Sequence, residues 1–173
     1  MARGQAERLL PLLEALLAEA GLAWRDLAAI GVGTGPGNFT GLRIAVAAAR
    51  GLALGLGIPA VGIPAADALG DGLGPVTVAL PAPGGRVHLL HGGLIHVASP
   101  GEAPPPGWPR RVAGPAAGLV GGAAVVDAAP LAPTIARLAL RRAVPGGPRP
   151  VPLYARPADA APPADPPPAV LDG

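Results

Sequence analysis

The stretch Gly35-Pro36-Gly37-Asn38-Phe39-Thr40-Gly41-Leu42-Arg43 decides the fold, and it contains the only phenylalanine and the only asparagine of the 173 residues. The preceding residues 27–33 read as a short buried strand, and residues 42–56 read as a proline-free helix. Glycines and a proline allow a tight turn between them, and Thr40 is placed to cap the helix. The stretch therefore predicts strand, glycine-rich turn and helix N-terminus, which is an α/β arrangement.

The turn is also a candidate ligand loop, because it presents backbone N–H groups that suit an anion or a closely approaching chain. Two common phosphate loops are excluded. The spacing provides no third glycine for a dinucleotide-binding Gly-x-Gly-x-x-Gly, and a Walker loop needs a lysine, which the chain lacks. A plain structural turn without a ligand remains the alternative. The candidate loop residues are Gly35, Gly37, Asn38, Thr40, Gly41 and Arg43.

Residues 35–63, GPGNFTGLRIAVAAARGLALGLGIPAVGI, carry a family resemblance. They resemble the GPGSFTG-R segment of the bacterial TsaB (YeaZ) family, accessory subunits for threonylcarbamoyladenosine synthesis on tRNA. The similarity is close over residues 4–69, weak over 70–144, and returns at 151–160, where Pro152-Leu153-Tyr154-Ala155-Arg156 is similar to a C-terminal family motif. The resemblance implies an α/β chain with the actin-like, sugar-kinase and Hsp70-like ATPase fold.

The chain also departs from the family pattern. Asn38 replaces the usual serine, Ala45 replaces the usual glycine, and Pro81 to Gly85 replaces an Asp-Ala-Arg turn. Met1 corresponds to an interior position of the pattern. We therefore expect the family's opening hairpin, with its Asp-Thr-Ser turn, to be missing and the fold to be incomplete at its N-terminus.

Proline and glycine positions suggest the organisation of the chain. We expect a first lobe at residues 1–99, a reduced second lobe at 100–144 after a proline-rich connector, and a proline-rich tail at 145–173. Strands are expected at 59–63, 76–80, 87–91, 94–98, 111–114 and 123–126, with helices at 64–69 and at 134–142, the latter capped by Thr134.

Two helices provide a candidate partner interface. The first carries a wide stripe of leucines and ends at Gly21, and the second is apolar nearly all round. A sheet and a helix of the same chain could cover them, but in so short a chain we favour one face binding a partner. The expected interface residues are Leu9, Leu13, Leu16, Leu17, Gly41, Ala45, Ala49 and Ala53. By the resemblance, the partners are a TsaD-type catalytic subunit, a TsaE-type ATPase, tRNA through the complex and, as a further option, a second copy in a homodimer.

Groups that carry catalysis are scarce. The chain has no cysteine, no lysine and three histidines, and its net charge is +2. His88 and His91 are three apart on an expected strand, so they face opposite sides and cannot chelate one metal ion. Ser99 and the aspartates Asp67, Asp71 and Asp127 read as turn residues or caps. We therefore expect no catalytic residue, no metal and no intrinsic cofactor, and by the resemblance ATP belongs to partner subunits.

Neither a membrane-spanning segment nor a signal peptide is recognisable, so a cytoplasmic protein is expected. The arginine pairs 110–111 and 141–142, with Arg149, read as solvated surface rather than a tRNA site. Two alternatives to the accessory subunit stay open. One is a small actin-fold kinase or acyltransferase that uses the Gly35–Gly41 loop, and the other is an inactive fragment.

Overall fold

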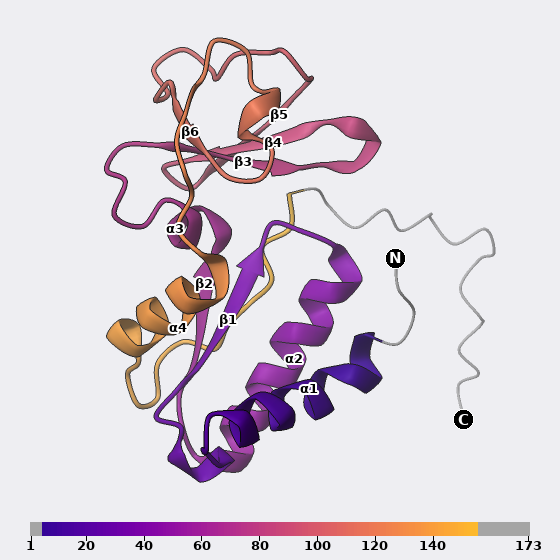
Figure 1. Cartoon of the computed structure of the whole chain (residues 1–173), viewed down its shortest axis with the longest axis vertical. Coiled ribbons are helices and arrows are strands. Elements are labelled where there is room, and N and C mark those ends of the chain that lie inside the picture. Colours follow the sequence, from indigo (N-terminus) through magenta and orange to yellow (C-terminus); the bar gives the residue numbers. More distant parts are fainter. Residues whose placement is uncertain (1–4, 156–173) are drawn as a thin grey trace, which may run out of the picture.

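The computed structural model describes residues 5–155, and the strands of this region form two sheets (Figure 1). The first sheet pairs β1 (Ile30–Gly35) with β2 (Ala60–Pro64) in parallel. The second sheet has five strands in the order β5-β4-β3-β6-β7. Its strands are β3 (Thr77–Pro81), β4 (Val87–His91), β5 (Leu94–Ala98), β6 (Arg111–Ala113) and β7 (Ala124–Val125).

Four α-helices accompany these sheets in the described part of the chain: α1 (Gln5–Glu19), α2 (Phe39–Leu56), α3 (Ala65–Leu69) and α4 (Leu131–Arg142). Short 3₁₀ turns lie at Trp24–Asp26, Pro83–Gly85 and Ala117–Leu119. Gly21, with φ of +68°, follows α1, as the sequence predicts.

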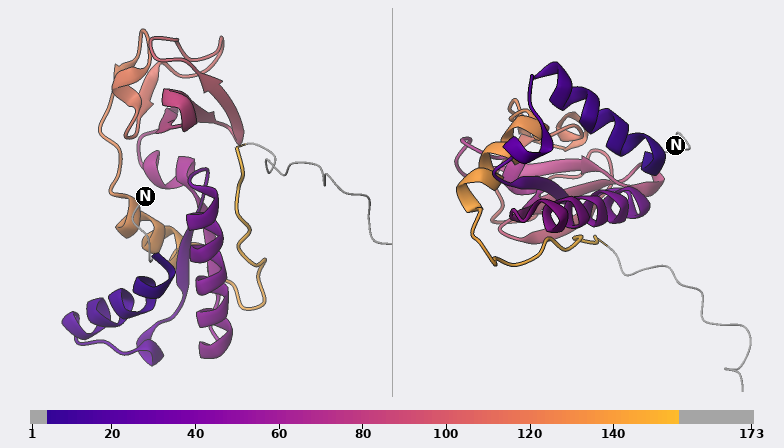
Figure 2. Two further views of the ribbon diagram at one scale, coloured as in Figure 1. Left: turned by 90° about the vertical axis from the view of Figure 1, so that its right-hand side faces the viewer. Right: turned by 90° about the horizontal axis from the view of Figure 1, so that it is seen from below.

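The first sheet is enclosed between α2 and α4 (Figure 2). Val32 of β1 clusters with Val46 and Ala49 of α2. On the other face Gly31 faces α4, where a Cβ added at residue 31 would lie 2.7 Å from the Cβ of Ala139. Successive residues of a strand point to opposite faces, so this alternation of valine and glycine lets α4 approach the sheet closely.

The second sheet has a core on each face. One cluster includes Leu89 and Val112, and the other includes Val78 and Leu90. β3, β4 and β5 are antiparallel, whereas β6 and β7 continue the sheet in parallel from β3. The side chain of Thr77, fully buried, donates to the carbonyl of Pro109 at 2.9 Å.

The predicted boundary between residues 99 and 100 is wrong for this architecture. It falls between β5 and β6, which belong to one sheet because β6 pairs with β3. The helix expected in the second lobe, α4, instead packs on β1 and β2. The chain thus leaves the first sheet after α3, completes the second sheet, and returns. Beyond residue 155, the predicted tail lies outside the described residues.

Two predicted helix starts are also wrong. α2 begins at Phe39 rather than at residue 42, and its N-cap is Asn38 rather than Thr40. α4 begins at Leu131, so Thr134 is buried inside its first turns instead of capping it. Pro133 lies in the first turn of α4, where proline is tolerated because its missing N–H has no intrahelical partner.

Ion pairs join α3 and the turn after it to α4, and they correct the expectation that Asp67 and Asp71 act as caps. Asp67 Oδ2 lies 2.7 Å from Arg142 Nη1, and Asp71 Oδ2 lies 2.8 Å from Arg137 Nη2. Arg142, which the sequence suggests is a solvated surface residue, is therefore an ion-pair partner as well as partly exposed. Both pairs are partly exposed, so each contributes little stability, about 0–1 kcal/mol.

By length and composition α2 could cross a membrane, since it has 18 residues with a mean hydropathy of 1.4. It is the one such helix among the described residues, and the sequence analysis did not recognise it. The same composition is typical of a helix inside a soluble protein. In this structure 17% of the helix is buried, and a single helix of this kind is weak evidence for a membrane.

Candidate partner-binding face and glycine loop

The apolar stripe of α1 is largely uncovered in the described structure. Leu10, Leu12 and Leu16 are 44%, 58% and 53% exposed, and the predicted interface residues Leu9, Leu13 and Leu17 are only half-buried. Full burial of a leucine is favourable by roughly 1.5–3 kcal/mol relative to exposure. An uncovered stripe of this width favours contact with another protein surface.

The small-residue stripe of α2 lies differently from the prediction. Ala49 and Ala53 are 5% and 4% exposed, and Ala49 packs with Val32 of β1. Gly41 and Ala45 are half-buried. The expectation that Ala49 and Ala53 contact a partner is therefore wrong, because the helix turns this stripe toward its own sheet. The alternative of coverage by the same chain holds for these two alanines.

A different set of small residues on α2 faces the groove next to α1. Leu10 of α1 and Trp24 form one wall of this groove, which has a volume of about 460 Å³. Nothing lies within 4 Å of a Cβ added at Gly51 or Gly55, so both glycines have open space beside them. The α2 wall consists of Ala48, Gly51, Leu52, Gly55 and Leu56. The groove is apolar and open to a partner helix. The sequence prediction followed the stripe of residues 41, 45, 49 and 53, and the groove residues lie beside that stripe on other faces of the helix.

The glycine loop is closed by its own residues. Asn38 Oδ1 accepts a hydrogen bond from the Gly41 N–H at 2.8 Å, and the Asn38 carbonyl accepts from the Leu42 N–H. Gly35 has φ of +97°, and an added Cβ would lie 2.7 Å from Leu42 Cδ1, so only glycine fits at this position. Of the predicted anion-binding residues, Gly41 thus uses its N–H group within the loop. Gly37 and Thr40 are exposed.

The C-terminal segment is anchored to this loop. The Leu153 N–H donates to the Thr34 carbonyl at 2.7 Å, and the Tyr154 ring lies 4.8 Å from the Phe39 ring, centroid to centroid. The guanidinium carbon of Arg43 lies 5.1 Å from the Phe39 centroid. Arg43 thus makes a cation–π contact beside the loop. The structure therefore brings together the loop and the similar C-terminal motif, which are more than 100 residues apart in the sequence.

One surface cluster contains the residue types of a hydrolase triad without its geometry. His96 Nε2 lies 3.0 Å from Glu102 Oε1, and the Ser99 backbone N–H donates to Glu102 Oε2 at 2.9 Å. Ser99 thus joins the cluster through its backbone rather than its hydroxyl, whereas a nucleophilic serine must bond the histidine through its hydroxyl. The Ser99 hydrogen bond, followed by that of His96, holds the pKa of Glu102 below its ordinary value.

The remaining histidines have structural contacts. His91 Nδ1 lies 3.0 Å from the Val76 carbonyl, and its ring lies 5.6 Å from the Trp108 ring. His88, on the same strand, is 6% exposed. Within residues 5–155 no group of three or more histidine, cysteine or acidic side chains could hold a metal ion. Whether a ligand or cofactor binds the chain remains a separate prediction.

Comparisons with known proteins show which family this chain resembles. The family model for TsaD, tRNA N6-adenosine threonylcarbamoyltransferase, matches residues 1–90. An uncharacterized protein of Mycobacterium tuberculosis is 51% identical over 69 residues, which are 40% of this chain and 33% of that protein. The Escherichia coli tRNA threonylcarbamoyladenosine biosynthesis protein TsaB is 41% identical over 61 residues, 35% of this chain and 26% of TsaB. The matched stretch spans a third or less of the length of these curated relatives.

A solved structure from Pseudomonas aeruginosa, described as an uncharacterized protein with similarity to peptidase YEAZ, superimposes with a TM-score of 0.65. It is 28% identical, and the match covers 89% of this chain and 85% of that one. A second, YeaZ from Pseudomonas aeruginosa, gives a TM-score of 0.62 at 27% identity, with the same coverage of both chains. The fold is thus the actin-like ATPase fold in its YeaZ form. Because the family model matches more than half of the 173 residues, the chain belongs to the TsaD family, and within it the chain is TsaB-like.

Proposed function

We propose that this chain is an accessory subunit in the synthesis of threonylcarbamoyladenosine on tRNA, and that it acts by pairing with a TsaD-type catalytic subunit. The observation that carries the proposal is the uncovered apolar face of α1 with the adjoining groove along α2. Membership of the TsaD family and similarity to proteins named TsaB support the pathway. The transfer itself would take place on the catalytic subunit.

The groove suits a helix of the partner. Gly51 and Gly55 leave the α2 backbone open, so a partner helix can approach closely, as helices do across small residues. Leu10 and Leu16 would then be buried against the partner instead of facing water. This apolar burial favours a stable contact with little dependence on charge.

The same proposal places the other components on the partner side. A TsaE-type ATPase and tRNA would join through the complex, ATP would be bound by the partner subunits, and the compartment would be the cytoplasm. A second copy of this chain would compete for the same apolar face as a homodimer. These assignments rest on the family and on analogy with TsaB.

Gly55→Leu tests the interface without weakening the fold. Nothing lies within 4 Å of an added Cβ at residue 55, and leucine is a better helix former than glycine. The new side chain would fill the groove and obstruct a partner helix. We expect binding to a TsaD-type subunit, measured by calorimetry, to weaken by about tenfold or more, as at a central interface position.

Ala136→Leu on the exposed face of α4 is the matched control, because it introduces the same side chain on a helix away from the groove. Its affinity should equal that of the unmodified chain, and both variants should keep the circular dichroism spectrum. Unchanged affinity of the Gly55→Leu variant would show that the partner binds elsewhere. Light scattering of the same variants reports whether a homodimer uses this face.

A further inference from the structure

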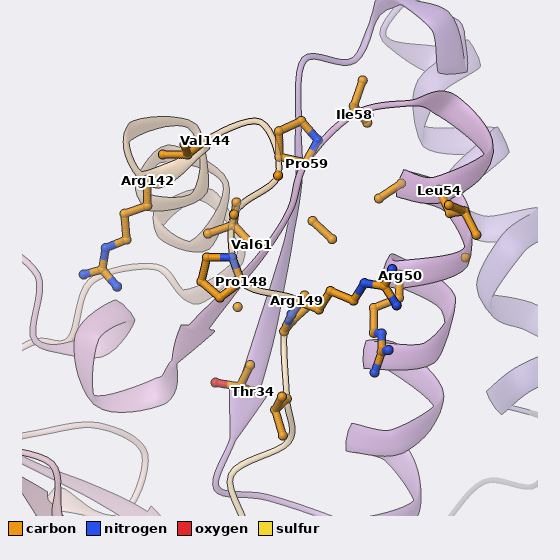
Figure 3. A pocket seen from close by; sticks show the side chains of 18 of the residues that line it. Thr34, Arg50, Leu54, Ile58, Pro59, Val61, Arg142, Val144, Pro148 and Arg149 are labelled. Atoms are coloured by element: carbon orange, nitrogen blue, oxygen red, sulfur yellow. The ribbon is translucent and has the colours of Figure 1, made fainter.

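A second cleft lies on the opposite side of α2 from the α1 groove (Figure 3). Here the segment that follows α4 runs back over the first sheet toward the glycine loop. Its volume is about 810 Å³. One wall is the C-terminal half of α2, the floor is β2, and the other wall is the segment of residues 144–151. The family resemblance gives this cleft no role.

The lining of the cleft is apolar and basic. Leu54, Ile58, Pro59 and Val144 contribute apolar surface, and no aspartate or glutamate is among the lining residues. Three arginines reach the cleft, namely Arg50, Arg142 and Arg149. Arg142 is neutralised by Asp67 at 2.7 Å. Among the described residues no carboxylate forms an ion pair with either of the other two arginines.

Arg50 and Arg149 approach the cleft from opposite walls. Figure 3 shows the Arg149 side chain extending from the C-terminal segment toward Arg50 on α2. Two guanidinium groups repel each other, and their repulsion is relieved when an anion lies between them. A guanidinium presents its N–H donors in a planar fork that matches the oxygens of a phosphate or a carboxylate.

We propose that this cleft binds a small organic anion, whose phosphate or carboxylate group is held by Arg50 and Arg149 and whose apolar body lies along Leu54, Ile58 and Val144. The volume falls within the roughly 300–1,000 Å³ that is typical of small-molecule sites. An RNA strand is a poorer occupant, because the lining residues include no aromatic side chain on which a base could stack. The site stands independently of the proposed accessory function.

The test uses the full chain and three probes that share one aromatic body. Calorimetric titration with 1-naphthyl phosphate and with 1-naphthoate should give saturable binding, whereas neutral 1-naphthol should bind at least about tenfold more weakly, because it cannot accept the charge-assisted hydrogen bonds. The tighter of the two anions identifies the preferred charged group. Inorganic phosphate alone should bind more weakly than the naphthyl ester, since it lacks the apolar body.

The double variant Arg50→Gln with Arg149→Gln should reduce the affinity for the tighter anion at least about tenfold, and Arg141→Gln should leave it unchanged. Arg141 lies on the exposed side of α4 outside the cleft, so its variant shows what the loss of a positive charge elsewhere on the surface does to the affinity. All three sites are exposed, so the variants should remain folded. Equal affinity in the double variant, an equal loss in the Arg141→Gln variant, or tight binding of 1-naphthol would each overturn the proposal, as would an arginine-dependent affinity for tRNA that exceeds that for the small anions.

Discussion

Glu102 fixes the turn after β5 through both of its carboxylate oxygens, one on the Ser99 N–H and one beside His96. Its pKa in the folded chain lies below the ordinary value of 4.5. A depressed carboxyl pKa stabilises the fold above that ordinary value, and the contribution is lost as the pH falls through the folded pKa. We expect carbon-detected NMR to give a Glu102 midpoint below 4.5.

Glu102→Gln keeps the shape of the side chain and removes the titrating group. The Ser99 amide signal should then lose its pH dependence in the acidic range, whereas in the unmodified chain it shifts as Glu102 protonates. A midpoint at or above the ordinary carboxyl value would show that the Ser99 hydrogen bond does not form in solution.

Asn38 shows how far the residue types alone predict the N-cap of α2. Asparagine and threonine are both good N-caps, so residue type alone cannot decide between Asn38 and Thr40. The choice depends on where the backbone becomes helical, and this follows from the close packing of Gly35 against Leu42 and Leu153. The sequence therefore predicts a capped turn, but the register of the cap depends on contacts with a segment more than 100 residues away.

At the scale of elements, α2 has two faces with opposite tolerance for charge. Ala49 is 5% exposed against β1, whereas the neighbouring Ala47 is exposed. Ala49→Glu would bury a carboxylate without a partner and should lower the free energy of unfolding by on the order of 3–5 kcal/mol. Ala47→Glu, on the same helix, should change it by less than about 0.5 kcal/mol. Urea denaturation followed by circular dichroism measures both values.

This contrast matters for interface mutagenesis. A loss of partner binding by the Ala49→Glu variant would report unfolding, and therefore says nothing about contact with the partner. Equal stability of the Ala49→Glu and Ala47→Glu variants would mean that α2 is not docked on β1 and β2 in solution. The stripe of Gly41, Ala45, Ala49 and Ala53 would then again be a candidate surface for a partner.

The elements that sequence reasoning located best are those with local determinants. The hairpin of β4 and β5 was predicted with its observed bounds, because two short runs rich in apolar residues flank the Gly92-Gly93 turn. α1 was found from its leucine period and from Gly21. The face that α2 buries was not found, because that helix is apolar nearly all round and its periodicity indicates no direction.

At the scale of the whole molecule, long-range pairing limited the prediction. The parallel pairing of β3 with β6 and the return of α4 to β1 join residues far apart in sequence, and no local pattern specifies them. Both clefts also form between residues that are far apart in the sequence. The α1 groove joins Leu10 to Gly55, and the basic cleft joins Arg50 to Arg149. The family resemblance indicated the fold class, but neither cleft could be derived from residue spacing.

The last prediction concerns activity: the isolated chain should neither hydrolyse ATP nor transfer threonylcarbamoyl to tRNA. Turnover needs a positioned base, nucleophile or metal in addition to binding. In the described structure the one serine meets Glu102 through its backbone, His91 contacts a carbonyl, and Asp67 and Asp71 are held by arginines. These groups are occupied by structural contacts, which leaves few candidates to carry out a reaction.

The assay combines this chain with the carbamoylating, catalytic and ATPase subunits and tRNA, leaving out one component at a time. Modified tRNA should decline sharply without this chain and should be absent with this chain alone. The Gly55→Leu variant should reproduce the omission, because it blocks the face proposed to bind the catalytic subunit, whereas Ala136→Leu should retain full activity. ATP hydrolysis by the purified chain that is lost in Thr40→Ala or Arg43→Ala would instead identify the Gly35–Gly41 loop as part of an active site, and the chain as an enzyme in its own right.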